Sequence, residues 1–223
     1  MTEISATPDA RTLVVSAALD LFARQGFDQT SVEQIAQAAG VSRSTFFRQF
    51  GGKDDVVFTD HEALLAHVRD FLADQHENPW QAVCESATLV FAHYAQDPEI
   101  ARRRYEVVRQ VPALREREII TVFRYERLFD HYLRTALPGV APLDAVSFSA
   151  DVTAVHNHVL RRLLRGSDVP VSELSAALDT VMRRFHVHPD EQADAADDDL
   201  VVAMFPRTMP TAEVVRRLRA ELD

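Results

Sequence analysis

The chain has 223 residues, of which 47% are hydrophobic, and a formal net charge of −10 at pH 7. This length predicts one small and one larger domain, and the absence of a run of about 18 apolar residues excludes a membrane-spanning helix. The single cysteine, Cys84, excludes an intramolecular disulfide and is expected to be a buried structural thiol. The acidic N-terminus has no signal-peptide pattern, so we expect a cytoplasmic protein without a membrane partner.

The negative charge argues against binding to nucleic acid, because neutralisation of phosphates supplies much of the affinity for DNA. The acidic residues are unevenly distributed along the chain, however. Residues 190–199 hold six acidic side chains and no basic one. Any DNA contact elsewhere in the chain is therefore expected to depend on a few well-placed side chains and on two copies of the protein, and not on a broad positive field.

A first helix is predicted to begin at Thr7-Pro8-Asp9 and to end at Gly26. The threonine is a helix N-cap, proline is favoured at the first helical position, and the aspartate interacts favourably with the helix N-terminus. The apolar stripe of this helix contains Val14, Ala18 and Phe22 at helical spacing. The sequence up to Phe50 is expected to form a small three-helix core.

Two short helices are predicted next, separated by a tight turn. Thr30 or Ser31 caps the first of them, because glutamate and glutamine stand three residues later in the spacing of a capping box. Gly40 follows where a left-handed residue ends the helix, and Ser42 caps the second helix. This order of helix, glycine-containing turn and helix is typical of the helix-turn-helix unit, whose second helix lies in the DNA major groove. An αα-hairpin that only packs in a core remains the alternative.

The polar positions of the second helix suit DNA recognition. Arg43 can bind guanine bidentately, Ser44 and Thr45 can approach bases or phosphates, and Arg48 can reach phosphate. A lysine at the start of the following helix is a candidate phosphate contact. The expected DNA-binding residues are Thr30, Ser42, Arg43, Ser44, Thr45, Phe47, Arg48 and Lys53.

The sequence from Thr30 to Phe50 follows the pattern Thr-Ser-Val-x-x-Ile-Ala-x-x-Ala-Gly-Val-Ser-x-x-Thr-Phe-Phe-x-x-Phe, and Lys53 comes three residues later. This pattern resembles the DNA-binding signature of the tetracycline-repressor (TetR) family. The similarity extends upstream to Arg11 and covers about the first quarter of the chain. Two departures stand out: Phe47 occupies a position where a tyrosine often contacts phosphate, and two glycines replace the usual Pro-Ser before the lysine.

This resemblance implies a bacterial transcriptional regulator, in most cases a repressor, that binds a palindromic operator in double-stranded DNA as a homodimer. It also implies that a small apolar ligand in the C-terminal bundle lowers the affinity for DNA. The long helix that begins at Lys53 would transmit ligand occupancy to the DNA-binding domain. The competing hypotheses are a helical protein-interaction module with an unused helix-turn-helix and a bundle enzyme without a recognisable site.

The remaining sequence predicts an all-α bundle, with helices bounded by proline and glycine. We expect three parts: a helix-turn-helix domain over residues 1–52, a ligand-binding and dimerisation domain over 53–188, and an acidic linker with a helical tail over 189–223. The predicted bundle helices cover residues 53–72, 80–95, 98–108, 112–136, 142–164 and 171–185.

Aromatic residues of the bundle are candidates for lining a ligand pocket, although an aromatic residue at helical spacing more often packs in a core. The expected ligand-binding residues are Trp80, Phe91, Tyr105, Phe123 and His156. No spacing of the nine histidines predicts a metal site, no phosphate loop or nucleophile elbow is present, and neither a cofactor nor catalysis is expected.

The predicted helix 142–164 carries two apolar stripes at helical spacing. One contains Phe148, Val152 and Val159, and the other contains Thr153 and His156. We expect one of the two stripes to pack on the bundle and the other to contact another copy of the chain, in a two-fold interface. The alternative is that both stripes are buried within one chain.

Overall fold

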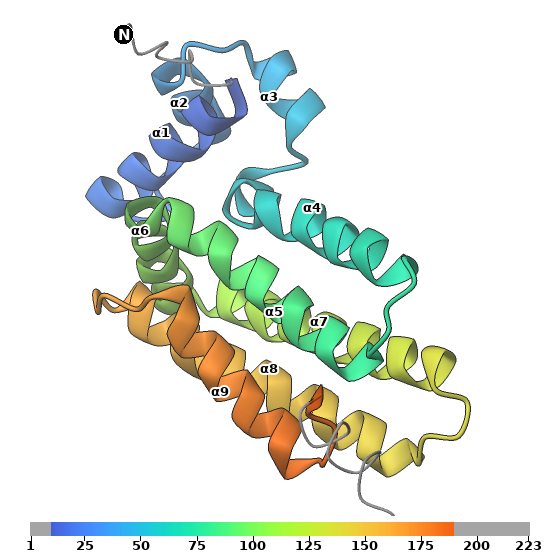
Figure 1. Cartoon of the computed structure of the whole chain (residues 1–223). Coiled ribbons are helices and arrows are strands. Elements are labelled where there is room, and N and C mark those ends of the chain that lie inside the picture. The colour runs from blue at the N-terminus through green and yellow to red at the C-terminus, as the bar shows by residue number, and fades with distance from the viewer. Residues whose placement is uncertain (1–9, 190–223) are drawn as a thin grey trace, which may run out of the picture. The chain divides into compact units, whose positions relative to one another are not determined.

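The computed structural model describes residues 10–189. These residues form nine α-helices and no strand (Figure 1), which confirms the all-α prediction for this part of the chain. No helix among them is both long enough and apolar enough to cross a membrane. The expected acidic linker, the tail and the Thr7 cap lie outside the described residues. The helices are α1 (Ala10–Gln25), α2 (Val32–Ala38), α3 (Arg43–Gln49), α4 (Lys53–Ala73), α5 (Pro79–Gln96), α6 (Pro98–Gln110), α7 (Pro112–Ala136), α8 (Pro142–Leu164) and α9 (Val171–Arg184).

Proline begins four of the bundle helices, as the sequence predicts: α5, α6, α7 and α8 each have one in the first turn. Two of these starts also have a side-chain cap. Asn78 Oδ1 accepts a hydrogen bond of 3.0 Å from the backbone N–H of Trp80, and Asp97 Oδ1 accepts one of 3.1 Å from Ile100. Such caps satisfy amide groups that have no partner within the helix.

Helices α1 to α3, called the head here, share one hydrophobic core with parts of the bundle. Ile35 and Phe46 are fully buried in it together with Val56 and Val57 of α4. Val107 and Val108 of α6 and Leu114 of α7 belong to the same core. The head therefore packs directly on α4 and α6 through α1, and α4 leads from α3 along the bundle (Figure 1).

Helices α4 to α9 form the bundle, and α5 contacts all of the other five. Its buried side chains include Val83, Ala87 and Phe91. Helices α8 and α9 pack together along one side of α5 (Figure 1). This second core is made of apolar side chains from α4 to α9, and a cavity opens inside it.

The expectation that one of the two apolar stripes of α8 is left for another copy of the chain is wrong. Phe148 and Val152 of the first stripe are buried within a single chain, and so are Thr153 and His156 of the second. The reason is that α8 is surrounded by α5, α6, α7 and α9, so both of its apolar sides face neighbours in the same chain. Val146 of the second stripe remains 40% exposed.

Candidate functional site

The turn between α2 and α3 is built by local capping, as the sequence predicts. Ser31 is the N-cap of α2: its Oγ accepts a hydrogen bond of 3.2 Å from the backbone of Gln34, and the Gln34 side chain accepts one of 2.9 Å from the Ser31 N–H. Gly40 has φ of 69°, a left-handed conformation that glycine adopts without steric cost. Ser42 then caps α3 by accepting a hydrogen bond of 3.0 Å from the Thr45 N–H.

Helix α3 has one buried and one exposed face. Phe46 is fully buried and Phe50 is 3% exposed, and the centres of their rings lie 5.3 Å apart. Phe47 points away from this core and is 44% exposed. The apolar anchor and the exposed aromatic residue therefore stand next to each other in the sequence but on different faces of the helix.

The exposed face of α3 carries the expected DNA-binding residues in a mutually supported arrangement. The Ser42 hydroxyl lies 2.9 Å from that of Ser44 and 2.8 Å from that of Thr45. Arg43 pairs with Glu33 of α2 at 3.1 Å, and its guanidinium lies 5.5 Å from the centre of the Phe47 ring. Arg48 is exposed on the last turn. This surface presents hydroxyl groups, two guanidinium groups and one aromatic ring to solvent.

Two other expected DNA-binding residues lie elsewhere. Thr30 is 2% exposed, and its hydroxyl donates a hydrogen bond of 2.8 Å to the Gly26 carbonyl. The Lys53 ammonium donates to the carbonyls of Phe27 at 2.7 Å and Thr30 at 3.2 Å, and lies 4.3 Å from the centre of the Phe27 ring. In this structure both side chains fasten the loop between α1 and α2, and Lys53 joins that loop to the start of α4.

The bundle contains a cavity of about 90 Å³ between α4, α5, α6, α7 and α8. Its walls are largely aromatic and aliphatic, and polar side chains interrupt them at several points. The lining residues include Phe58, His61, Arg104, Tyr105, Glu118, Val122, Tyr125, Phe129 and His156.

The cavity contains two of the five residues expected to bind a ligand, Tyr105 and His156. Trp80 packs instead against Phe148, with ring centres 4.8 Å apart. Phe91 is fully buried in the core behind the cavity wall, and Phe123 is 56% exposed on the outside of α7. His61 and Arg104 were not expected in a pocket, because nothing local in the sequence shows that they converge.

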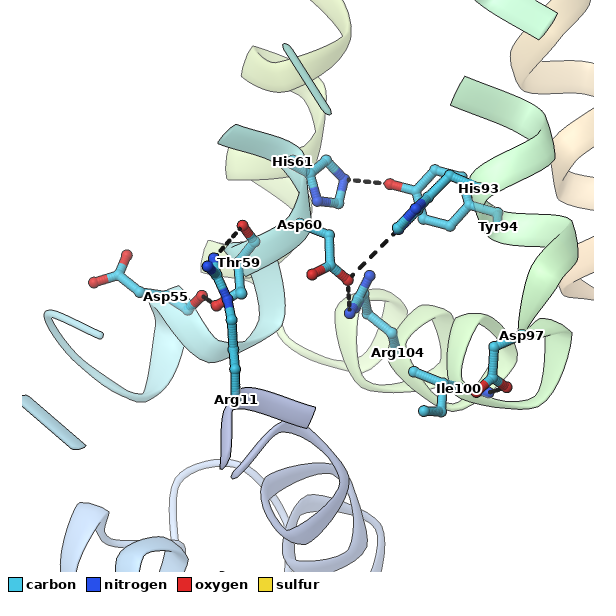
Figure 2. A network of polar contacts seen from close by, with 10 residues as sticks. All are labelled: Arg11, Asp55, Thr59, Asp60, His61, His93, Tyr94, Asp97, Ile100 and Arg104. Atoms are coloured by element: carbon cyan, nitrogen blue, oxygen red, sulfur yellow. Dashed lines mark hydrogen bonds and ion pairs between the residues drawn. The ribbon is translucent and has the colours of Figure 1, made fainter. Parts of the chain in front are cut away.

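A polar network connects the cavity wall to α4 (Figure 2). The guanidinium of Arg104 on α6 donates a hydrogen bond of 2.7 Å to Asp60 Oδ2 on α4, and Arg104 is only 5% exposed. His93 of α5 approaches the same oxygen at 3.8 Å. His93 first, and then the charge of Arg104, hold the pKa of the Asp60 carboxyl well below its ordinary value of 3.8. Asp60 is therefore a carboxylate at neutral pH.

The same network reaches the first helix and a second histidine. The Arg11 guanidinium of α1 donates a hydrogen bond of 3.0 Å to the Thr59 carbonyl of α4. On the cavity side of α4, His61 Nε2 lies 3.0 Å from the Tyr94 hydroxyl of α5 (Figure 2). One turn of α4 thus contacts α1, α5 and α6 through polar side chains.

The geometry defines a helix-turn-helix head on an all-α bundle with an internal cavity. Residues 14–59 match the model of bacterial regulatory proteins, tetR family. MftR of Mycobacterium tuberculosis is 33% identical over 104 residues, which are 45% of this chain and 52% of that protein. The transcriptional regulator TcmR of Streptomyces glaucescens is 42% identical over 77 residues, which are 33% of each chain. The similarity to the tetR family thus lies in the N-terminal domain.

The chain matches about half or less of the length of these two relatives. The bundle is compared through its fold. The structure of the SmeT–triclosan complex has a TM-score of 0.58 to this chain at 19% identity, and the match covers 91% of this chain and 100% of that one. At this identity the likeness establishes the fold alone.

Proposed function

We propose that the protein is a DNA-binding transcriptional regulator, acting as a ligand-responsive repressor that binds a palindromic operator as a homodimer. The exposed face of α3, with Arg43, Ser44, Phe47 and Arg48 on the second helix of a helix-turn-helix, carries this proposal. The family match over residues 14–59 supports it. Recognition helices of this unit present their N-terminal residues to base edges in the major groove.

Arg43 is the proposed base-reading residue. Its exposed ion pair with Glu33 is worth little in water, so guanine can replace the carboxylate at small cost. The pair and the Phe47 ring hold the guanidinium at the surface before DNA arrives. The hydroxyls of Ser42 and Ser44, at the N-terminus of α3, are placed to contact phosphate.

Replacing Arg43 by alanine should weaken binding to the preferred site by about 1–3 kcal/mol and relax selectivity at one base pair. The preferred site is first selected from random duplexes with the full chain, and affinities are then measured by fluorescence anisotropy at several salt concentrations. Arg69→Ala, an exposed arginine near the far end of α4, is the matched control and should bind like the parent. Equal affinity and selectivity of the Arg43 variant and the parent would refute this assignment.

Replacing Lys53 by methionine tests whether this residue contacts phosphate or holds the head. Its two carbonyl partners predict a loss of roughly 1.5–3 kcal/mol of unfolding free energy, the usual value of hydrogen bonds to a charged group. The salt dependence of DNA binding should stay unchanged. Arg48→Met should show the reverse: unchanged stability and a salt slope smaller by about 1. A stable Lys53 variant with a reduced slope would show that the lysine contacts phosphate after all.

The homodimer is proposed because a palindrome offers two half-sites about one helical turn apart, which a two-fold symmetric pair of heads can fill. Two copies also compensate for the acidic net charge, since each head needs only a few contacts. The full chain at micromolar concentration should sediment at twice its mass of 25.1 kDa. A monomer under these conditions, together with a selected site that lacks two-fold symmetry, would contradict the proposal.

Ligand response is proposed to act through α4. Arg104 lies in the cavity wall and holds Asp60 of α4, while Lys53, at the start of α4, holds the loop between α1 and α2. A small, largely apolar molecule in the cavity would displace α6 or α7 relative to α4, and so move the head. Such a molecule releases DNA only if it binds the non-DNA-binding conformation more tightly. SmeT, whose fold is similar, has been solved with triclosan, which agrees with a small-molecule role for this bundle.

A further inference from the structure

Four residues that line the cavity each carry a buried polar atom that has no hydrogen-bond partner among the described residues. These atoms are His61 Nδ1, Arg104 Nε, Tyr125 OH and His156 Nε2, and they come from four different helices. Arg104 and His156 are 5% and 8% exposed. A buried polar group without a partner costs roughly 1–3 kcal/mol, and the great majority of such groups in native proteins are paired. Four of them around one cavity indicate a binding site for a molecule with polar atoms of its own.

The charges around the cavity favour a neutral ligand over an anion. Arg104, the one guanidinium among the lining residues, is already neutralised by Asp60. Burial lowers the pKa of both His61 and His156 to about 4, so neither histidine is charged at neutral pH. The Glu118 carboxyl also lines the cavity. An anion would lose its hydration in this cavity and would find no unpaired positive charge there. The free energy of its desolvation exceeds what hydrogen bonds to the neutral groups can offset.

The hydrogen-bond chemistry excludes a simple cation. The free Nε–H of Arg104 can only donate, so the ligand has to bring an acceptor. An ammonium group has only donors and would leave this N–H unpaired. A hydroxyl or carbonyl oxygen accepts from Arg104, and the Tyr125 hydroxyl and the two neutral imidazoles can each act as donor or acceptor towards a second polar group.

The size and the walls indicate a single ring. The volume of about 90 Å³ is of the order of the roughly 150 Å³ cavity that binds benzene in an engineered protein. The rings of Phe58, Tyr105, Tyr125 and Phe129 line the space, and aromatic walls favour a flat apolar ligand through stacked and edge-to-face contacts.

We propose that the bundle cavity binds a neutral, single-ring compound with hydroxyl or carbonyl oxygens, one oxygen accepting a hydrogen bond from Arg104 and exchanging another with Tyr125. This inference rests on the proposed function only in treating the cavity as the regulatory ligand site. It adds to the small apolar ligand expected from the sequence an oxygen that is hydrogen-bonded to Arg104 and Tyr125.

The test uses the full chain and four probes that share a six-membered ring: phenol, benzene, benzoate and benzylamine. Titration calorimetry should show phenol binding at least about tenfold more tightly than benzene, the effect of about one net hydrogen bond. Benzoate and protonated benzylamine should not bind measurably. Tyr125→Phe should weaken phenol binding and leave benzene binding unchanged, so the preference for phenol becomes smaller while the hydrogen bond from Arg104 remains. Tyr132→Phe, on the same helix but outside the cavity and against His76, is the matched control and should bind phenol like the parent.

Val122→Phe provides a second variant that fills the cavity without removing a polar group, and it should abolish phenol binding while the protein still melts cooperatively. Equal binding of benzene and phenol, preferred binding of benzoate or benzylamine, or phenol binding unaffected by both Tyr125→Phe and Val122→Phe would overturn the proposal. DNA binding is measured on the same preparation. Specific DNA binding without phenol binding overturns this inference and leaves the regulator intact, whereas phenol binding without specific DNA binding supports the site and overturns the proposed function.

Discussion

Phe46→Ala is expected to lower the unfolding free energy by about 3–5 kcal/mol, the usual cost of removing a buried phenylalanine ring. Phe46 is fully buried, and its ring contacts those of Phe47 at 5.6 Å and Phe50 at 5.3 Å. It is the main anchor of α3, a helix of only seven residues that cannot be stable without tertiary packing. Specific DNA binding should therefore be lost together with stability. Guanidinium denaturation followed by circular dichroism measures the first effect, and anisotropy measures the second.

The neighbouring residue provides the control. Phe47 is 44% exposed, so Phe47→Ala should cost less than about 1 kcal/mol of stability while still weakening DNA binding. The two substitutions remove the same side chain from adjacent positions and differ in what that side chain contacts. If Phe47→Ala were the more destabilising of the two, or if Phe46→Ala left DNA binding unchanged, the described orientation of α3 would be incorrect.

Arg104→Leu is expected to destabilise the protein by about 2–3 kcal/mol, because it removes the guanidinium that pairs with the Asp60 carboxylate. The cost should be smaller than for a fully buried pair, since the Asp60 side chain is 31% exposed. Asp60→Leu combined with Arg104→Leu should recover most of the loss, because no charge then remains unpaired. Denaturation of the parent, the two single variants and the double variant gives the coupling free energy.

The same double variant tests the proposed route from the cavity to the head. It should still bind the selected DNA site. Because Arg104 is also a proposed ligand contact, phenol is added at concentrations that saturate this variant by calorimetry. Bound phenol should then no longer weaken DNA binding, because α6 no longer holds α4 through the ion pair. The exposed pair Glu106–Arg109 at 3.4 Å is the control, and its coupling should be below about 1 kcal/mol. An unchanged ligand response in the double variant would show that the signal reaches the head by another route.

The sequence by itself was sufficient for the features that depend on neighbouring residues along the chain. The caps at Ser31 and Ser42, the left-handed Gly40 and the prolines that begin four helices act within one helical turn, so their effect can be predicted without knowing the fold. The exposed face of α3 follows from these signals, since the two caps and the turn fix where the helix begins. This is why the helix-turn-helix and the all-α class were predictable.

Only the tertiary structure decided which side chains of different helices meet. The periodicity of the sequence predicted two apolar stripes on α8. It could not show that four neighbouring helices of the same chain would bury both stripes. The position of Lys53 at the start of a helix predicted a phosphate contact, whereas the fold places two backbone carbonyls beside its ammonium group. The cavity brings together His61, Arg104 and Tyr125 from three helices, and their convergence depends on helix packing angles and long-range contacts. Such contacts are set by the packing of the whole core, and no local pattern in the sequence encodes them.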